Sequence, residues 1–192
     1  MAPFFSFGRR LEIMDLVVSA SLNPQSRSRL LAEACRVRLQ RAGRPVEMLD
    51  LAELPLPFCD GATAYGEPAA KHALDMVRRA HAVFFAAPVY NYDVNAAAKN
   101  LVELTGQAWT GKVVSFLLAA GGQGSYMSGM GLANSLMLDF RCLIIPRFIY
   151  ATGEAFDQTQ VVDEGITTRI DQLVEETLRI SDAIRPEEPH LS

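Results

Sequence analysis

Long apolar runs, paired cysteines and clustered basic residues are all missing from this sequence. The longest apolar run, around Ala82 to Val89, is far shorter than the ~20 residues that a membrane-spanning helix needs. The 3 cysteines, Cys35, Cys59 and Cys142, are odd in number and lack CxxC spacing, which argues against a disulfide framework or a zinc site. The 18 basic residues are spread along a chain of net charge −4. A membrane span and a nucleic-acid partner are therefore not expected.

Histidines and nucleotide-binding motifs are also scarce. His72, His81 and His190 cluster neither with a cysteine nor with a GxSxG elbow, so hydrolase and metalloenzyme functions lack their parts and no metal is predicted. Neither GxGxxG nor GxxxxGK[ST] is present, which disfavours classical Rossmann and P-loop nucleotide binding. No side chain is predicted to be catalytic.

The length of 192 residues suits one domain better than two, and 49% apolar with 21% charged residues is ordinary globular composition. We expect a flexible extension over residues 1–13, one domain over 14–185 and a tail over 186–192. The segment from Met1 to Leu11 lacks an apolar stretch followed by a cleavage site, so no secretory signal is expected. The cytoplasm is the expected compartment.

Apolar runs and helical periodicity alternate along the chain. Short apolar runs predict five strands, at Leu16–Ala20, Pro45–Leu51, Ala82–Ala87, Lys112–Ala120 and Cys142–Tyr150. Helical spacing predicts five helices, at Arg27–Ala42, Glu67–Ala80, Asn95–Leu104, Ser128–Asp139 and Glu164–Ile184. Right-handed helical crossovers then predict an α/β fold with a doubly wound, five-stranded parallel sheet in a three-layer sandwich. The last helix is expected to cover this sheet or a partner subunit.

Ligands of such sheets bind beyond the carboxyl ends of the strands, which directs attention to the loops there. The loop after the first predicted strand places small polar residues where a helix begins, at Ser19, Ser21, Asn23, Ser26, Arg27 and Ser28. Unpaired backbone N–H groups and the helix dipole favour a negative charge at such a place, so this loop predicts a phosphate site. A single serine acting as a helix cap is the simpler alternative, but it accounts for one hydroxyl only.

Two later loops have the composition of a cofactor site. The loop after the third predicted strand contains Pro88, Val89, Tyr90, Asn91 and Tyr92, whose two tyrosines are placed to flank a planar ring or simply to cover the core. Three glycines in four positions follow the fourth strand and allow close backbone approach to a ligand. The candidate residues of this last loop are Ala120, Gly121, Gly122, Gln123 and Tyr126.

At these three loops the sequence resembles the NADPH-dependent FMN reductase family of flavodoxin-like enzymes. The segment Ala20–Ser28 is similar to the family pattern GS-[LP]-R-x-x-S-x-[SN], with Asn23 in place of the usual arginine. The segment Pro88–Asn100 is similar to P-x-Y-N-x-x-x-P-G-x-L-K-N, with Asn95 and Ala96 in place of Pro-Gly. A GKxV strand that leads to a small-residue GG turn is the third common feature.

The resemblance implies that FMN is the cofactor and that NADPH or NADH donates a hydride, from nicotinamide C4 to flavin N5. In that case the serines would hold the FMN phosphate, Pro88 to Tyr92 would contact the ribityl chain and isoalloxazine, and backbone amides of Asn91 and of Gly121 or Gly122 would tune the flavin. The resemblance also implies a homodimer or homotetramer. The electrons would pass to a small-molecule acceptor such as free flavin or a quinone. Alternatively, reduced FMN would be transferred to a flavin-dependent monooxygenase.

Two alternative functions stay open at this point. A flavodoxin-like electron carrier would have a more acidic chain than this one. An FMN-binding sensor without reductase turnover is kept open by Asn23, since an amide replaces a cation of the family pattern.

Overall fold

The computed structural model describes residues 14–184. The predicted extension over 1–13 and the predicted tail over 186–192 lie outside the described residues, so the domain boundaries stay predictions.

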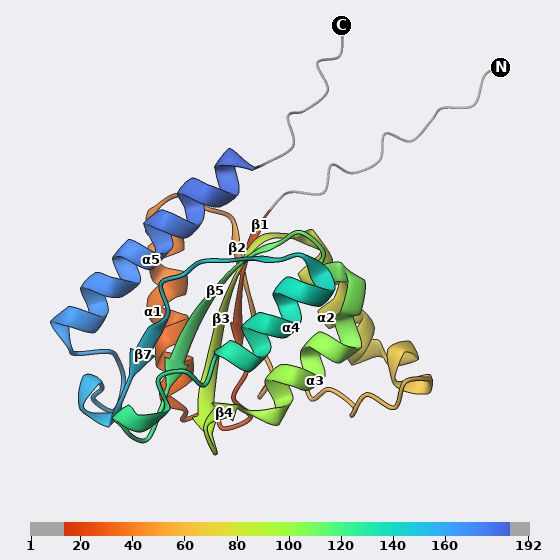
Figure 1. The fold of residues 1–192 in the computed structure, drawn as a ribbon, viewed down its shortest axis with the longest axis horizontal. Helices are drawn as coiled ribbons and strands as arrows, with labels where there is room; N and C mark the ends of the chain where they lie inside the picture. The colour runs from red at the N-terminus through yellow and green to blue at the C-terminus, as the bar shows by residue number, and fades with distance from the viewer. Residues whose placement is uncertain (1–13, 185–192) are drawn as a thin grey trace, which may run out of the picture.

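A parallel sheet forms the middle layer of the molecule (Figure 1). Its strands follow the order β2-β1-β3-β5-β6. The strand β7 also pairs with β5, farther along β5 than β6 does. Chain connections leave β1 toward β2 on one side and return to β3 on the other, so strand order reverses between β1 and β3. This arrangement confirms the predicted doubly wound α/β fold. The strands are β1 Met14–Ser19, β2 Val46–Asp50, β3 Ala80–Tyr90, β4 Asp93–Val94, β5 Val113–Ala119, β6 Leu143–Ile144 and β7 Ile149–Ala151.

Helices cover both faces of the sheet, each over its own hydrophobic core (Figure 1). The helices are α1 Arg27–Arg41, α2 Pro68–Arg79, α3 Ala96–Thr105, α4 Met130–Phe140 and α5 Glu164–Ala183, with short 3-10 turns at Thr63–Gly66, Gly106–Trp109, Gln123–Ser125 and Gly153–Ala155. The α1 and α5 side chains pack on one face, and those of α2, α3 and α4 on the other. Strand residues alternate between the cores, as Phe84 and Phe85 of β3 do. The apolar stripe of α5 therefore covers the sheet.

The fifth predicted strand, Cys142–Tyr150, is broken in the structure. Its ends form β6 and β7, which pair with β5 through Val113↔Leu143 and Leu117↔Ile149. Pro146 lies in the gap, and proline has no N–H to donate to a strand ladder. The prediction of one continuous strand was wrong at this point.

The predicted loop after the third strand is a hairpin. The strand β3 continues to Tyr90, and β4 pairs back on it antiparallel, with Tyr90 opposite Asp93. The two turn residues, Asn91 and Tyr92, have φ of 52° and 67°, the left-handed conformation that a tight two-residue turn requires. Neither residue is a glycine, so the sequence carries no turn signal of the usual kind.

Candidate functional site

The loop between β1 and α1 is stabilised by its own polar side chains. Ser26 is the N-cap of α1: its Oγ accepts the backbone N–H of Ser28 at 3.2 Å and lies 2.7 Å from Ser28 Oγ. Asn23 Oδ1 accepts the N–H of Gln25 at 3.0 Å, and Ser21 Oγ accepts the N–H of Asn23 at 3.2 Å. The simpler alternative, a serine that acts as a helix cap, therefore holds for Ser26. The side chains of Ser21 and Asn23 instead fix the loop that precedes the helix.

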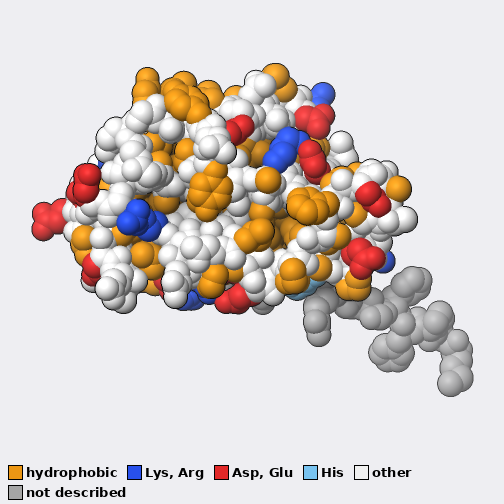
Figure 2. Space-filling view, turned by 90° about the horizontal axis from the view of Figure 1, so that it is seen from below, with side chains coloured by type: hydrophobic (Ala, Val, Ile, Leu, Met, Phe, Trp, Pro, Cys, Tyr) orange, Lys and Arg blue, Asp and Glu red, His pale blue; other side chains and the backbone are white. Residues whose placement is uncertain are grey.

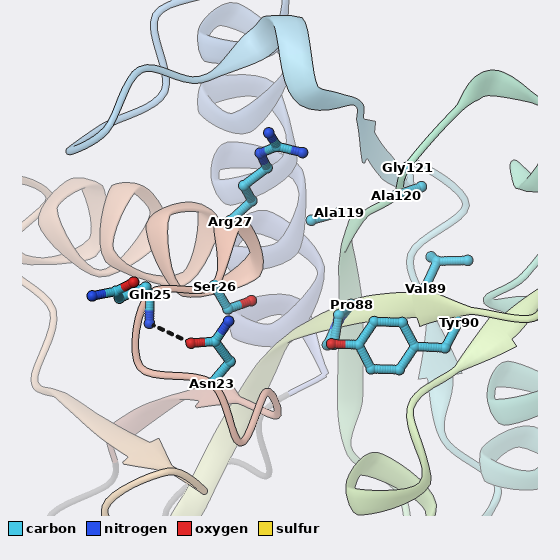
Figure 3. A pocket seen from close by; sticks show the side chains of 10 residues that line it. All are labelled: Asn23, Gln25, Ser26, Arg27, Pro88, Val89, Tyr90, Ala119, Ala120 and Gly121. Atoms are coloured by element: carbon cyan, nitrogen blue, oxygen red, sulfur yellow. Dashed lines mark hydrogen bonds between the residues drawn. The ribbon is translucent and has the colours of Figure 1, made fainter.

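A cleft of about 480 Å³ opens where this loop meets the ends of β3 and β5 (Figure 3). The lining residues come from three separate loops, which are Asn23, Gln25, Ser26 and Arg27, then Pro88, Val89 and Tyr90, then Ala119, Ala120 and Gly121. The cleft lies beside the switch point between β1 and β3, where open α/β sheets bind their ligands. Figure 2 shows this end of the molecule, with apolar side chains gathered around a hollow surface.

Sequence reasoning identified most of the lining and missed Gln25 and Ala119. Gln25 stands inside the predicted phosphate loop, and Ala119 is the residue before the predicted glycine turn. Both could have been found by including every residue of the two loops, because backbone as well as side chains line a cleft at strand ends.

The remaining predicted site residues lie around the cleft without lining it. Ser19, Ser21 and Ser28 are buried beneath it. Asn91 and Tyr92 form the exposed hairpin turn, and Gly122 is exposed next to Gly121. Gln123 and Tyr126 instead line a neighbouring pocket of about 520 Å³ with Met127, Met130, Pro146, Phe148, Tyr150 and Arg169. Contacts of these residues with a cofactor stay predictions.

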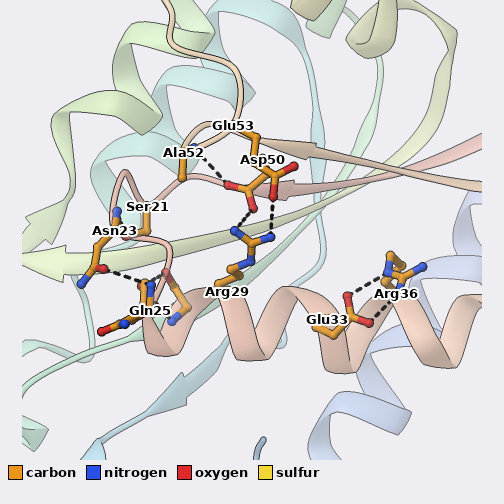
Figure 4. Close-up of polar contacts among 11 residues, drawn as sticks. Ser21, Asn23, Gln25, Arg29, Glu33, Arg36, Asp50, Ala52 and Glu53 are labelled. Atoms are coloured by element: carbon orange, nitrogen blue, oxygen red, sulfur yellow. Dashed lines mark hydrogen bonds and ion pairs between the residues drawn. The ribbon is translucent and has the colours of Figure 1, made fainter. Parts of the chain in front are cut away.

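The charges near the start of α1 are unequally paired. Arg29 reaches across to Asp50 at 2.7 Å and to Glu53 at 2.7 Å at the end of β2 (Figure 4). Its hydrogen bond to Glu53 raises the pKa of the guanidinium. Arg27 has no hydrogen-bond or ion-pair partner among residues 14–184, through either its backbone N–H or its side chain. The first turn of α1 therefore presents an unpaired donor and a cation beside the cleft.

Asn95 ties two walls of the cleft together and was not predicted as a site residue. This buried residue donates from Nδ2 to the carbonyl oxygen of Ala20 at 2.7 Å, and from its backbone N–H to that of Pro88 at 3.2 Å. The loop before α1 and the hairpin are thus joined through one side chain. The departure from Pro-Gly in the second motif was the signal that could have found it.

Comparison with known proteins supports the resemblance seen at the three loops. Residues 15–157 match the family described as NADPH-dependent FMN reductase. The chain belongs to this family. An NAD(P)H-dependent FMN reductase of Pseudomonas aeruginosa is 30% identical over 171 residues, which cover 84% of this chain and 91% of that protein. An FMN-dependent NADH:quinone oxidoreductase of Bordetella parapertussis is 29% identical over 195 residues, which cover 82% and 93%.

Solved structures show the same fold. The flavoenzyme NAD(P)H:(acceptor) oxidoreductase FerB of Paracoccus denitrificans matches with a TM-score of 0.73 and 19% identity, over 88% of this chain and 97% of that one. An archaeal flavodoxin matches with a TM-score of 0.59 and 13% identity, over 85% and 98%. Family membership confirms the predicted activity class, a flavin-dependent oxidoreductase that uses FMN and a nicotinamide donor.

The lining of the cleft fits FMN in charge and in polarity. Among the described residues, no acidic side chain lines it, and the unpaired backbone N–H of Arg27 stands at the positive end of the α1 dipole. The wall formed by Pro88, Val89 and Tyr90 offers apolar surface for a planar ring. One end therefore suits a phosphate and the other an isoalloxazine.

Residues 14–184 have neither a metal-ligand cluster nor a membrane-spanning helix. No group of three or more His, Cys, Asp and Glu side chains in this range is arranged to hold a metal ion. Among the helices of the same range, none is long and apolar enough to cross a membrane.

Proposed function

We propose that this chain binds FMN in the cleft at the start of α1 and reduces a quinone or free flavin with NADPH or NADH. The observation that carries the proposal is the cleft itself, in which the capped start of α1 faces the apolar wall at the end of β3. Bound FMN would supply a ring that takes a hydride from the nicotinamide and passes electrons onward.

The residues of this chain bind and orient the cofactor in this proposal. Ser26, Asn23 and the N–H of Arg27 hold the phosphate, and Pro88 to Tyr90 support one side of the ring. Gly121, two residues beyond the end of β5, would let the backbone approach the ring edge, because glycine has no side chain. No side-chain acid or base of this chain is assigned a catalytic role, because the cofactor would supply the redox chemistry and the chain would position it.

The acceptor is proposed from the relatives. Two of them are FMN-dependent NADH:quinone oxidoreductases, and one is an FMN reductase. These names favour a small planar acceptor that meets the flavin after the nicotinamide leaves. Transfer of reduced FMN to a monooxygenase is the other route open to the same cleft.

The test is an anaerobic titration of purified protein with FMN, followed by NADPH or NADH, with the visible flavin absorption as the signal. We expect FMN to bind and its absorption to bleach within the mixing time, then to recover when a quinone is added. A bound flavin that neither donor bleaches would indicate an electron carrier or a sensor. A protein that binds no FMN would contradict the proposal.

We further propose a homodimer or a homotetramer, formed through the face around α4. Phe58 is 83% exposed and Leu138 71% exposed, and Met130 and Met137 are partly exposed on the same helix as Leu138. Leu138 also lines a groove between α3, α4 and the loop before α2. Sedimentation should give a multiple of the chain mass, and Leu138→Lys should shift it to the monomer. A wild-type monomer at micromolar concentration would contradict this assembly.

Cytoplasmic location stays a prediction. It is supported by Cys35, Cys59 and Cys142, which are all free thiols, as is usual in a reducing compartment.

A further inference from the structure

We propose that a second cleft next to the FMN cleft binds the adenosine end of the nicotinamide donor, with the Arg27 guanidinium contacting a phosphate of that donor. This inference rests on the proposed function and adds to it a place for the part of the donor that is remote from the reacting ring.

The second cleft continues from the first. It has a volume of about 760 Å³ and shares Gln25, Ser26 and Arg27 with the FMN cleft. Pro24, Leu30 and Phe156 give it apolar surface, and the amide groups of Gln25 and Gln158 stand at its edge. Apolar surface interleaved with polar side chains suits an adenosine, which has both a flat ring and hydroxyl groups, and the volume is within the ~300–1,000 Å³ of small-molecule sites. A ligand that starts in the FMN cleft can therefore extend past Arg27 into this space.

Arg27 is the group that connects the two clefts. Figure 3 shows its side chain extending from the start of α1 away from Ser26 and Asn23. The guanidinium lies against Gly153, where a Cβ would be only 3.1 Å from Nη1 and 3.3 Å from Cζ. Gly153 thus leaves the space that the guanidinium occupies. A planar cation without a partner is suited to a phosphate, because its N–H groups can bind two oxygens at once.

The acid in the second cleft sets the direction of the ligand. Asp157 Oδ1 accepts the backbone N–H groups of Thr159 and Gln160 and the hydroxyl of Thr159, so this carboxylate is held in its own turn. A negative charge there repels phosphate and accepts hydroxyl groups. The phosphate of the donor therefore belongs at the Arg27 end, and a ribose fits better near Asp157.

The backbone and the side chain of Arg27 have separate tasks in this arrangement. The N–H of Arg27 belongs to the start of α1 and serves the FMN phosphate, whereas the guanidinium serves the donor. A side-chain substitution leaves the N–H in place. This difference allows the two sites to be tested separately.

The experiment measures steady-state kinetics with NADPH and NADH, and the dissociation constant of FMN, for wild type, Arg27→Gln and Arg41→Gln. Arg41 is a matched control, since it lies in the last turn of the same helix and outside both clefts. We expect Arg27→Gln to lower the ratio of kcat/KM for NADPH to that for NADH about tenfold, which identifies the 2′-phosphate. FMN binding should change less than about twofold, and Arg41→Gln should match wild type.

Equal loss of kcat/KM for both donors, with unchanged FMN binding, would also support the proposal and assign Arg27 to the pyrophosphate that the donors share. Unchanged kinetics with both donors would overturn it, and so would weaker FMN binding as the main effect. If wild-type protein is not reduced by either donor, the proposed function itself fails, which is a different result from a normal wild type with a silent Arg27→Gln.

Two further variants act on the same site without removing Arg27. Gly153→Ala places a methyl group against the guanidinium and should lower kcat/KM for NADPH several-fold, because it displaces the guanidinium from its place. The fold should tolerate the change, since only the flexible end of a side chain has to move. Asp157→Asn removes a negative charge that repels the phosphate of the donor, so it should raise kcat/KM for NADPH. Opposite effects of the two variants support the proposed orientation, and effects of the same sign contradict it.

Discussion

At the scale of single residues, the hairpin turn combines a cost in stability with a place in the proposed site. Asparagine is among the residues that tolerate the left-handed conformation of Asn91, but at Tyr92, with φ of 67°, the Cβ comes close to the backbone and the conformation costs stability. Tyr92 is also 56% exposed, so burial of its side chain contributes too little stability to offset that cost. A strained and exposed tyrosine beside the cleft suggests retention for contact with a ligand.

Tyr92→Gly tests that interpretation. Asn-Gly is the preferred pair for this kind of turn, so we expect the free energy of unfolding of the FMN-free protein to rise by about 1 kcal/mol. FMN affinity should fall at the same time, because the ring is gone. Urea unfolding and an FMN titration of the same preparation measure the two effects. A variant that is less stable and binds FMN normally would show that Tyr92 serves the fold alone.

At the scale of elements, Asn95 joins the loop after β1 to the start of α3. Its Oδ1 is buried without a partner in the described part of the chain, although Nδ2 and the backbone N–H are bonded. A buried acceptor without a partner costs about 1–3 kcal/mol, which an alanine would not incur. We expect the bond to Ala20 to serve the site, because it fixes the loop after β1 against the start of α3.

Asn95→Ala should therefore change stability little, by less than about 1 kcal/mol, because the lost hydrogen bond and the relieved acceptor offset each other. FMN affinity should fall about tenfold, since the phosphate loop and the hairpin are no longer fixed relative to each other. Flavin fluorescence measures the affinity, and urea unfolding the stability. Asn134→Ala, on α4 and outside the FMN cleft, is the control for a lost amide. Normal FMN affinity in Asn95→Ala would remove Asn95 from the site.

Ion pairs fasten helices to the sheet, and the pair between Arg79 and Glu47 joins the end of α2 to β2. The two terminal guanidinium nitrogens, Nη1 and Nη2, donate to the carboxylate at 2.7 and 2.8 Å, and this hydrogen bonding lowers the pKa of Glu47. A lowered folded pKa contributes stability above the unfolded value of about 4.3, and that stability is lost as pH falls through the folded pKa. The free energy of unfolding should therefore drop below about pH 4. The drop in the free energy of unfolding should be smaller in Glu47→Gln than in wild type. The difference between the two drops should be less than about 1 kcal/mol, because the pair is partly exposed. An identical acid profile would contradict this.

Elements with a clear period could be predicted from the sequence, and features that depend on tertiary pairing could not. A continuous apolar run in β3 and helical spacing in α1 located these elements within a few residues. Pro146 was counted inside a strand because the flanking apolar residues kept the pattern of a strand. The hairpin at Asn91 carries no glycine, so only its pairing with β3 reveals it. Three loops of the cleft were found for a general reason, since parallel strands end on one side, whereas Asn95 depends on a contact over 75 positions.

At the scale of the whole molecule, the cleft is built on two cores that do not need a cofactor to form. The sheet is buried by α1 and α5 on one face and by α2, α3 and α4 on the other, while the cleft lies at the loops beyond the strand ends. FMN should therefore bind to a protein that is already folded. A ligand that binds only the folded state stabilises it by an amount set by its concentration relative to the dissociation constant.

This linkage gives a test of the phosphate site through riboflavin, which has the same ring and ribityl chain as FMN without the phosphate. At a hundred times the dissociation constant, FMN should add about 2.7 kcal/mol to the free energy of unfolding. For a domain of this size, that raises Tm by about 5–10 °C. Riboflavin at the same concentration should raise Tm far less, because the start of α1 then meets no anion. Ser26→Ala should reduce the FMN shift and leave the smaller riboflavin shift unchanged, after correction for the lost helix cap. Equal shifts with FMN and riboflavin would mean that the first loop does not bind the phosphate.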